Sequence, residues 1–507
     1  MSSKIFSAAV IGLDCEPIEV EADISGGLGS FTVVGLPDVA VQESRERVRA
    51  AVKNSHLPFP QTRVTVNLAP ADIKKAGPAY DLPIAISVLL ASKINFKNRI
   101  DLKKSIFIGE LSLDGSLRGV NGALSIALMC KNAGFDTLYL PKANAIEACL
   151  IKDIKIIPIA NLTELIEHLS GINEITPFRK DINDLTANEN YVYDMANIRG
   201  QEYAKRALEI TAAGAHNILM AGPPGSGKTL LSRTLPSILP KMTLDEKLEV
   251  TKIYSVSGKL PHSNPLINIR PFRSPHHTAS SAALIGGGTW PKPGEISMAH
   301  RGVLFLDEFP EFNRQVLESL RQPLEDGVVT VSRASGSLEF PAKFILAAAQ
   351  NPCPCGYATD PEKECICSPT QIIKYQRRVS GPLLDRIDLH IEVPKVKLDK
   401  LVSDKPSENS VAVRERTQKA RERQNIRFKD LDIFTNAEMN SHQVKRFCKI
   451  QNQGLDLLKN AVRQFNLSAR SYFKMLKLSR TIADLADSDL IEVHHIAEAL
   501  QYRPKTE

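Results

Sequence analysis

The sequence contains no apolar run that approaches the roughly 18 residues of a membrane-spanning helix. Asp14 and Glu16 follow closely on its first residues, so the start is too short and too acidic for a signal peptide. Eight cysteines in 507 residues are too few for a disulfide-stabilised scaffold. These absences argue against the membrane-embedded and disulfide-rich secreted classes, and we expect a cytoplasmic protein with no membrane partner.

The charge is not strongly one-sided either. The 64 lysines and arginines outnumber the 57 aspartates and glutamates, which gives a formal net charge of +7 and a pI near 8.8. This balance is compatible with a polyanionic partner, and it is equally ordinary for an enzyme without one. Hydrophobic residues make up 43% of the chain, enough for large cores, and the length predicts about two to four domains.

The stretch from Gly222 to Thr229 fits the phosphate-binding pattern G-x-x-x-x-G-K-[ST]. An apolar run at 217–221 predicts a buried strand before it, and 230–238 predicts a helix after it. Glycines let main-chain N–H groups form an anion-binding nest, and the helix N-terminus adds partial positive charge. We expect Lys228 to reach the β- and γ-phosphates of ATP and the Thr229 hydroxyl to hold Mg²⁺. The predicted nucleotide-binding residues here are Gly222, Pro223, Pro224, Gly225, Ser226, Gly227, Lys228, Thr229 and Leu230.

A pair of acids ends an apolar run further along the chain. Residues 303–306 predict a buried parallel strand, and Asp307 and Glu308 stand at its carboxyl end, where α/β sheets hold their ligands. We expect Asp307 to support Mg²⁺ through its water shell, and Glu308 to orient and deprotonate the attacking water. A surface pair of acids without a role is the alternative, which the preceding phosphate loop disfavours.

Four of the eight cysteines form two close pairs with nine residues between them. Such spacing lets four thiolates surround one Zn²⁺, although C-x-C is less common than C-x₂-C. Reduced thiols that bind no metal are the alternative. We predict a structural zinc site, with no open coordination position and hence no metal catalysis, formed by Cys353, Cys355, Cys365 and Cys367.

Residues 244–300 form a long insertion whose prolines and glycines are typical of loops. Two adjacent histidines in it do not share a helix face, and no third ligand stands at useful spacing, so a metal site is disfavoured there. Contact with DNA phosphates is the favoured role, and a locally hydrogen-bonded loop is the alternative. The candidate DNA contacts are Arg273, His276 and His277.

Residues 328–344 predict a β-hairpin with a glycine-containing turn, followed by another buried strand. Arg333 stands near the tip of this hairpin and is a further candidate contact to nucleic acid. Hairpin tips are also often merely solvated, so a plain surface position is the alternative. From residue 411 onward the pattern is helical.

Residues 1–172 alternate short β-rich runs with helical stretches and predict an α+β domain. The segments 75–81, 109–115 and 140–144 resemble the proteolytic domain of the Lon protease family. That family uses a Ser-Lys dyad, and Ala79 and Leu124 stand where the serine and lysine are expected. Because a serine protease needs a nucleophile and a base, the resemblance implies a Lon-like fold without proteolysis.

Along nearly its whole length the chain resembles the ComM/YifB family of magnesium-chelatase-like AAA+ ATPases. The motifs at 273–278, 294–297 and 351–356 carry this resemblance. It implies an α/β protein with a Lon-like domain, a P-loop AAA+ core and a helical lid. It also implies a homo-hexamer that hydrolyses ATP and binds single-stranded and branched DNA. In the family this activity drives branch migration when incoming DNA is recombined during natural transformation, together with recombination proteins.

The resemblance also implies roles for single residues. Ile198 lies in a turn expected beside the adenine, and Asn351 is expected to sense the γ-phosphate. Arg386 is expected to act as an arginine finger on the neighbouring subunit's nucleotide, and an ion pair with a nearby aspartate is its structural alternative. Arg470 is expected over the phosphates of its own subunit. The predicted catalytic residues are therefore Lys228, Glu308, Asn351, Arg386 and Arg470.

The predicted organisation is 1–172 Lon-like domain, 173–190 linker, 191–395 AAA+ core, 396–410 linker and 411–507 helical lid. Two other functions compete with a DNA motor. A metal-chelatase motor subunit shares the AAA+ core, but its usual form lacks the Lon-like domain and the cysteines. A Lon-like ATP-dependent protease or chaperone is opposed by Ala79 and Leu124.

Overall fold

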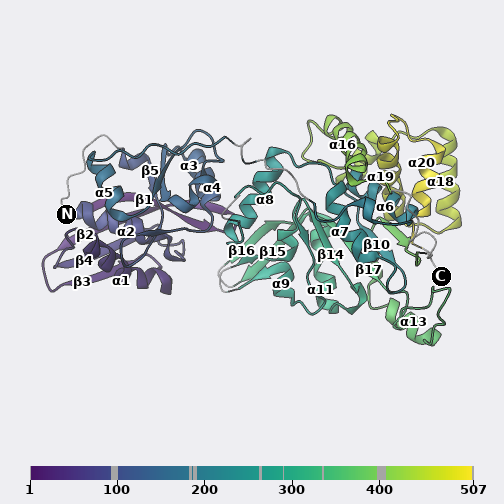
Figure 1. The fold of residues 1–507 in the computed structure, drawn as a ribbon, viewed down its shortest axis with the longest axis horizontal. Helices are drawn as coiled ribbons and strands as arrows, with labels where there is room; N and C mark the ends of the chain where they lie inside the picture. The colour runs from purple at the N-terminus through teal and green to yellow at the C-terminus, as the bar shows by residue number, and fades with distance from the viewer. Residues whose placement is uncertain are drawn as a thin grey trace. The chain divides into compact units, whose positions relative to one another are not determined.

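The computed structural model describes residues 2–92, 101–181, 185, 191–261, 265–288, 291–333, 336–396 and 407–504. The chain forms two compact units, 1–187 with 247–267 and 188–246 with 268–507 (Figure 1). The predicted linkers at 173–190 and 396–410 are described only in part, because 182–184, 186–190 and 397–406 lie outside the described residues. Within the described ranges, no helix has the length and apolar character needed to cross a membrane.

A mixed sheet forms the N-terminal unit, in the order β3-β4-β2-β1-β5-β8-β9. β2 pairs antiparallel with β1 and β4, β3 is parallel to β4, and β5, β8 and β9 continue in parallel beyond β1. The strands are β1 (Ser2–Ile11), β2 (Asp14–Ser25), β3 (Ser30–Val34), β4 (Arg63–Ala69), β5 (Ser105–Phe107), β8 (Thr137–Pro141) and β9 (Lys155–Ile159).

Alternation along the strands gives this sheet two buried faces. Ile5 and Phe107 belong to one hydrophobic cluster, with α1, α2 and α5, whereas Ile106 belongs to another, with α3 and α4. Ala79 and Leu124 pack in the second cluster, so apolar side chains occupy the positions of the Lon dyad. The remaining elements are α1 (Val39–Asn54), α2 (Asp81–Ala91), β6 (Glu110–Leu111), β7 (Leu117–Arg118), α3 (Ala123–Ala133), α4 (Ala145–Ala148) and α5 (Leu162–Ser170).

The N-terminal unit also includes residues 247–267, which the sequence alone assigns to the AAA+ core. Most of helix α8 (Leu244–Val256) lies in this segment. Lys252 Nζ lies 2.8 Å from Asp14 Oδ1, and Ser255 donates a hydrogen bond to Glu147. Helix α8 is continuous across residue 247, where the chain passes from one unit to the other. The sequence therefore shows no loop or linker signal at this domain boundary.

Five parallel strands form the sheet of the second unit, in the order β11-β14-β17-β10-β18. The central strands are nearly all apolar and buried, as expected for a parallel sheet covered on both faces. Their carboxyl ends therefore meet at one edge, which we call the carboxyl edge. The strands are β10 (Ile218–Ala221), β11 (Phe272–Arg273), β14 (Val303–Leu306), β17 (Ile345–Gln350) and β18 (Leu389–Glu392).

The two-residue strand β11 lies within the 244–300 insertion, whose prolines and glycines are typical of loops. The Val303 N–H donates to the Pro271 carbonyl at 2.8 Å, which brings the segment against β14. Gly302 permits this approach, because a Cβ at that position would lie 2.0 Å from the Pro271 oxygen. Proline before and after the strand limits it to an edge position.

Residues 313–325 have the pattern of one continuous helix but form two, α11 (Arg314–Ser319) and α12 (Arg321–Asp326). Pro323 explains the break, because its ring clashes with the carbonyl four residues earlier, at Ser319. The predicted hairpin forms from β15 (Val328–Arg333) and β16 (Gly336–Pro341). The other core elements are α6 (Glu202–Gly214), α7 (Lys228–Ile238), α9 (Ser281–Ile285), β12 (Gly286–Gly287), β13 (Lys292–Pro293), α10 (Glu295–Met298), α13 (Pro369–Gln376) and α14 (Gly381–Leu384).

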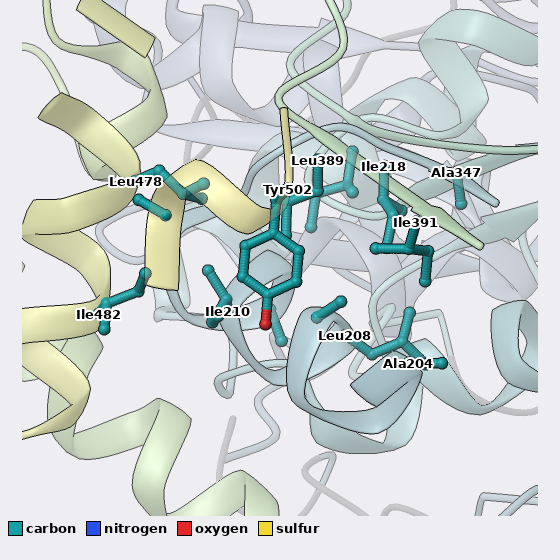
Figure 2. Packing of buried hydrophobic residues seen from close by; sticks show 14 of the residues in the cluster. Ala204, Leu208, Ile210, Ile218, Ala347, Leu389, Ile391, Leu478, Ile482 and Tyr502 are labelled. Carbon is teal, nitrogen blue, oxygen red and sulfur yellow. The ribbon is translucent and has the colours of Figure 1, made fainter. Parts of the chain in front are cut away.

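The C-terminal helices share one hydrophobic cluster with the parallel sheet. Tyr502 packs among side chains from α6, β18 and α19, including Ile210, Leu389 and Leu478 (Figure 2). Its carbonyl accepts the His390 N–H at 2.8 Å. The lid is therefore packed on the core. Its helices are α16 (Ser410–Arg427), α17 (Ser441–Phe447), α18 (Asn452–Gln464), α19 (Ala469–Leu485) and α20 (Val493–Gln501).

Candidate nucleotide site and cysteine cluster

The loop between β10 and α7 has the backbone that phosphate binding requires. Gly225 and Gly227 adopt φ values of 76° and 89°, which other residues rarely reach. Gly222 is needed for space, because a Cβ there would lie 2.2 Å from the Val393 carbonyl oxygen. Helix α7 begins at Lys228, so its first N–H groups face the same loop.

Lys228 is buried within this loop, with 8% of its surface exposed. Its Nζ donates to the carbonyls of Gly222 at 2.7 Å and Pro223 at 2.9 Å, and Asn351 Oδ1 lies 3.4 Å away. Burial lowers the pKa of the ammonium group, and the nearby Asp307 opposes that shift. The structure thus brings together two predicted site residues that are far apart in sequence.

Thr229 and Asp307 form the second half of the site. Thr229 Oγ1 donates to Asp307 Oδ2 at 2.8 Å, and the Glu308 N–H donates to Asp307 Oδ1 at 2.9 Å. A hydroxyl beside a carboxylate is the donor set that Mg²⁺ takes in nucleotide sites. Glu308 has a φ of 52°, and such strained conformations cluster at functional sites.

His277 lies at this site, where the sequence alone did not place it. Its Nδ1 is 2.9 Å from Glu308 Oε2, and its ring lies 4.1 Å from that of His276. His276 itself pairs with Thr278 Oγ1 at 2.9 Å. Both histidines follow β11, whose carboxyl end lies beside that of β14, so the contact is a consequence of strand order.

Ile198 and Gln201 lie on the approach to the phosphate loop. Ile198 is buried in the cluster that also holds Leu231 of α7. Gln201 has a φ of 60°, and its Nε2 donates to the carbonyls of Pro394 at 2.5 Å and Ser226 at 3.4 Å. The sequence analysis did not name Gln201 as a site residue. The one local signal for it was its position in the turn that follows Ile198.

Arg386 and Arg470 lie at the opposite edge of the sheet. Asn217, which precedes β10, donates to the Arg386 carbonyl at 3.0 Å, and both arginines line a cavity of about 740 Å³ next to Asn217, Ile345 and Asp388. A four-residue strand spans roughly 13 Å, so this edge is far from Lys228. The structure therefore does not bring Arg470 over the phosphate loop of its own chain, contrary to expectation.

Arg273, one of the candidate DNA contacts, is bound to a carboxylate of its own chain. Arg273 makes a two-pronged ion pair with Glu295, with Nε–Oε2 at 2.5 Å and Nη2–Oε1 at 2.7 Å. This pair favours a structural role for that guanidinium. Arg333 ends β15, and its side chain lies outside the described part of the structure.

The four clustered cysteines lie together in space. Their Sγ atoms all fall within 4.8 Å of one another, and three of the separations are 3.3, 3.6 and 3.6 Å. Tetrahedral thiolates at about 2.3 Å from zinc are about 3.8 Å apart, so the cluster is compatible with Zn²⁺. Main-chain N–H donation from Tyr357 lowers the pKa of the Cys355 thiol to about 6, which favours the thiolate form.

The cysteine cluster is attached to the nucleotide site. Gly356 packs on the phosphate loop so closely that a Cβ there would lie 2.7 Å from Pro224 Cδ. It adopts a φ of 87° and donates to the Cys353 carbonyl at 3.0 Å. Asn351, two residues before the first cysteine, contacts Lys228. The cluster thus supports both Pro224 and Asn351.

Family models and relatives match the chain in all of its parts. The description "Magnesium chelatase, subunit ChlI" matches 194–401, "Subunit ChlI of Mg-chelatase" matches 20–144, and the subunit's C-terminal model matches 407–503. Competence protein ComM of Haemophilus influenzae is 43% identical over 98% of this chain and 97% of its own. The chain belongs to the ComM/YifB family of magnesium-chelatase-like AAA+ ATPases. The protein YifB of Escherichia coli is 41% identical over 99% of this chain and 97% of its own.

The predicted family and α/β fold are thus confirmed, and membership implies ATPase activity. A magnesium-chelatase 38 kDa subunit of Cereibacter sphaeroides is 26% identical over only 32% of this chain and 53% of its own. The sequence did not identify His277 or Gln201 as residues of the nucleotide site. Their roles depend on which strands are neighbours, which is not a local property of the sequence.

Proposed function

We propose that the chain is an ATP-driven DNA motor that acts in recombination of incoming DNA during natural transformation. The observation that carries the proposal is the grouping of Lys228, Thr229, Asp307, Glu308 and Asn351 around one phosphate loop, in a chain that a competence protein matches over 98% of its length. In this proposal the motor is a homo-hexamer that binds single-stranded and branched DNA, alongside recombination proteins.

The geometry supports a division of labour at the nucleotide. Lys228 neutralises phosphate charge, and Asn351, 3.4 Å from it, senses the terminal phosphate and orients the water. Glu308 takes the proton from that water, and His277 holds the Glu308 carboxylate in place. Mg²⁺ supplies charge stabilisation when bound, with Thr229 and Asp307 as the residues that hold it. Ile198 borders the base.

The arginines complete the site only if another subunit contributes them. Arg386 lies at the opposite edge from its own phosphate loop, so its proposed role is on a neighbour's nucleotide, as in other arginine fingers. A ring provides this arrangement, because a head-to-tail interface places one subunit's arginine edge against the next subunit's nucleotide edge. The same argument moves the proposed role of Arg470 from its own subunit to the neighbouring one.

The proposed DNA contacts are Arg333 at the β15–β16 hairpin, with His276 beside the nucleotide site. Arginine contacts to phosphate oxygens bind DNA without reading its sequence, which suits a translocating motor. The net charge of +7 is compatible with this partner. Structural zinc in the cysteine cluster is a further part of the proposal, with four thiolates and no open position.

An ATPase assay with and without single-stranded DNA tests the proposal. Purified protein should hydrolyse ATP faster when DNA is added, and Glu308→Gln should bind ATP while turnover falls by about a hundredfold or more. Arg314→Gln, at an exposed position of α11, is the control and should behave as the unchanged protein. If DNA leaves the rate of ATP hydrolysis unchanged and the protein also fails to bind DNA, the motor proposal is wrong.

The two alternatives predict different readouts in the same assay. A chelatase motor is disfavoured because the 38 kDa chelatase subunit is 26% identical over 32% of the chain, whereas ComM is 43% identical over 98% of it. A protease is disfavoured because Ala79 and Leu124 supply no nucleophile or base. Stimulation of hydrolysis by unfolded protein, with release of peptides, would restore the protease alternative.

A further inference from the structure

Arg386 and Arg470 are bound to one carboxylate. Arg470 Nη2 donates to Glu325 Oε1 at 2.6 Å, and Arg386 Nη2 donates to Glu325 Oε2. The two arginines come from α19 and from the turn after α14, and Glu325 comes from α12. Two cations held this close repel each other, and the shared anion makes the arrangement stable.

This donor arrangement suits a phosphoryl group better than a carboxylate. Guanidinium groups bind phosphate through paired, charge-assisted hydrogen bonds, and two of them reach two oxygens of one phosphate as they reach the two oxygens here. The Nε of Arg386 is one of the few buried side-chain nitrogens among the described residues that have no hydrogen-bond partner. Arg386 Nε is thus a further donor, unused by Glu325, for a third phosphate oxygen.

We propose that Glu325 is an internal competitor for phosphate: it takes the place, between Arg386 and Arg470, of the terminal phosphate of a nucleotide bound by a second copy of this chain. Glu325 occupies this fork of two arginines in the isolated chain and leaves it when the phosphate enters. The proposal rests on the ring arrangement proposed above, and it assigns Glu325 a role that no local sequence motif indicates.

The position of Glu325 connects the fork to the hairpin. Helix α12 ends at Asp326, Gly327 turns the chain with a φ of 68°, and β15 begins at the next residue. The hairpin base is fixed to this turn, since the Ala342 N–H donates to the Gly327 carbonyl at 2.7 Å. Gln322 of α12 donates to Thr330 of β15 at 3.2 Å. A force on the β15–β16 hairpin is therefore transmitted to helix α12, which carries Glu325.

The test is ATP hydrolysis by Glu325→Gln, which keeps the shape and removes the charge. Without DNA, the variant should show an apparent KM for ATP about three- to tenfold lower than the unchanged protein, because the phosphate no longer competes with a carboxylate. Stimulation by single-stranded DNA should shrink in proportion. Glu19→Gln, which removes an acid paired with Lys4 at 2.7 Å in the N-terminal unit, should change neither quantity.

The opposite result has an equally clear reading. A lower kcat with an unchanged KM would show that Glu325 orients the arginines and does not compete with phosphate, and it would overturn the proposal. Glu325 is about half exposed, so the variant should fold, and thermal unfolding checks this. DNA binding is measured separately on the unchanged protein. Its absence removes the motor proposal, and the shift of KM without DNA still decides the role of Glu325.

Discussion

Glu308 is held in an unusual conformation by its surroundings. Its φ of 52° belongs to the left-handed region, which a non-glycine residue adopts at a cost of about 1 kcal/mol or more. The turn fixes the backbone, but the side chain is about half exposed and would be free without a partner. His277 supplies that partner, and we infer that it positions the carboxylate toward the water.

His277→Ala should therefore lower kcat by about tenfold and leave the KM for ATP nearly unchanged, as general-base alignment is lost and phosphate binding is kept. Steady-state hydrolysis measured over a range of ATP concentrations separates the two constants. His494→Ala is a matched control, because His494 also faces a glutamate, Glu492, at 3.6 Å but lies on α20. A rise in KM at constant kcat would instead indicate that His277 binds nucleotide.

The residues of the site differ in how far the sequence predicted them. Lys228, Thr229 and Asp307 belong to local motifs, because one loop or one strand end fixes their chemistry. His277 carried no local signal for its contact with Glu308, since that contact needs β11 beside β14. Glu325 is one acid among many on a helix, and only the tertiary fold brings two arginines to it.

At the scale of elements, the segment after β17 combines two tasks. Asn351 reaches Lys228, and the cysteine cluster begins two residues later and returns Gly356 to Pro224. Three of the four cysteines are partly exposed, so without a metal the segment that carries them has little apolar burial to stabilise it. Bound zinc would supply the missing rigidity, and metal binding of this kind contributes directly to folding.

Removing the metal should thus affect both stability and nucleotide binding. We expect the purified protein to carry one zinc per chain, measured by elemental analysis, and Cys355→Ser to lose it. The variant should unfold at a temperature lower by several degrees, and its KM for ATP should rise, because Pro224 and Asn351 lose their support. Cys149→Ser, at a half-buried cysteine outside the cluster, should keep its zinc. Equal metal content in both variants would contradict the assignment.

Periodicity predicted most of the elements, and proline and main-chain contacts explain the rest. The helices at Ser410–Arg427 and Ala469–Leu485 follow from their patterns, because each runs between clear end signals. Helix α12 separates from α11 because of Pro323, a single residue inside a helical pattern. The strand β11 depends on the space that Gly302 leaves for another segment, which no local pattern records.

For the whole molecule, the parallel sheet separates the catalytic groups into two sets. Lys228, Asp307 and Glu308 lie at the carboxyl edge, and the fork of Arg386 and Arg470 lies at the other edge. One chain alone therefore keeps these two arginines away from its own phosphate loop. In the proposed ring of copies the two edges meet at every interface, so hydrolysis should depend on assembly.

Mixing two inactive variants tests this arrangement. Lys228→Ala removes the phosphate loop's lysine, and Arg470→Ala removes part of the fork. If the fork serves the neighbour, an equal mixture restores about one quarter of the sites, since half keep Lys228 and half of those meet an intact fork. Asn351→Ala mixed with Lys228→Ala should restore nothing, because both residues serve the same phosphate loop. If Arg470 instead acts within its own chain, neither mixture should recover ATPase activity.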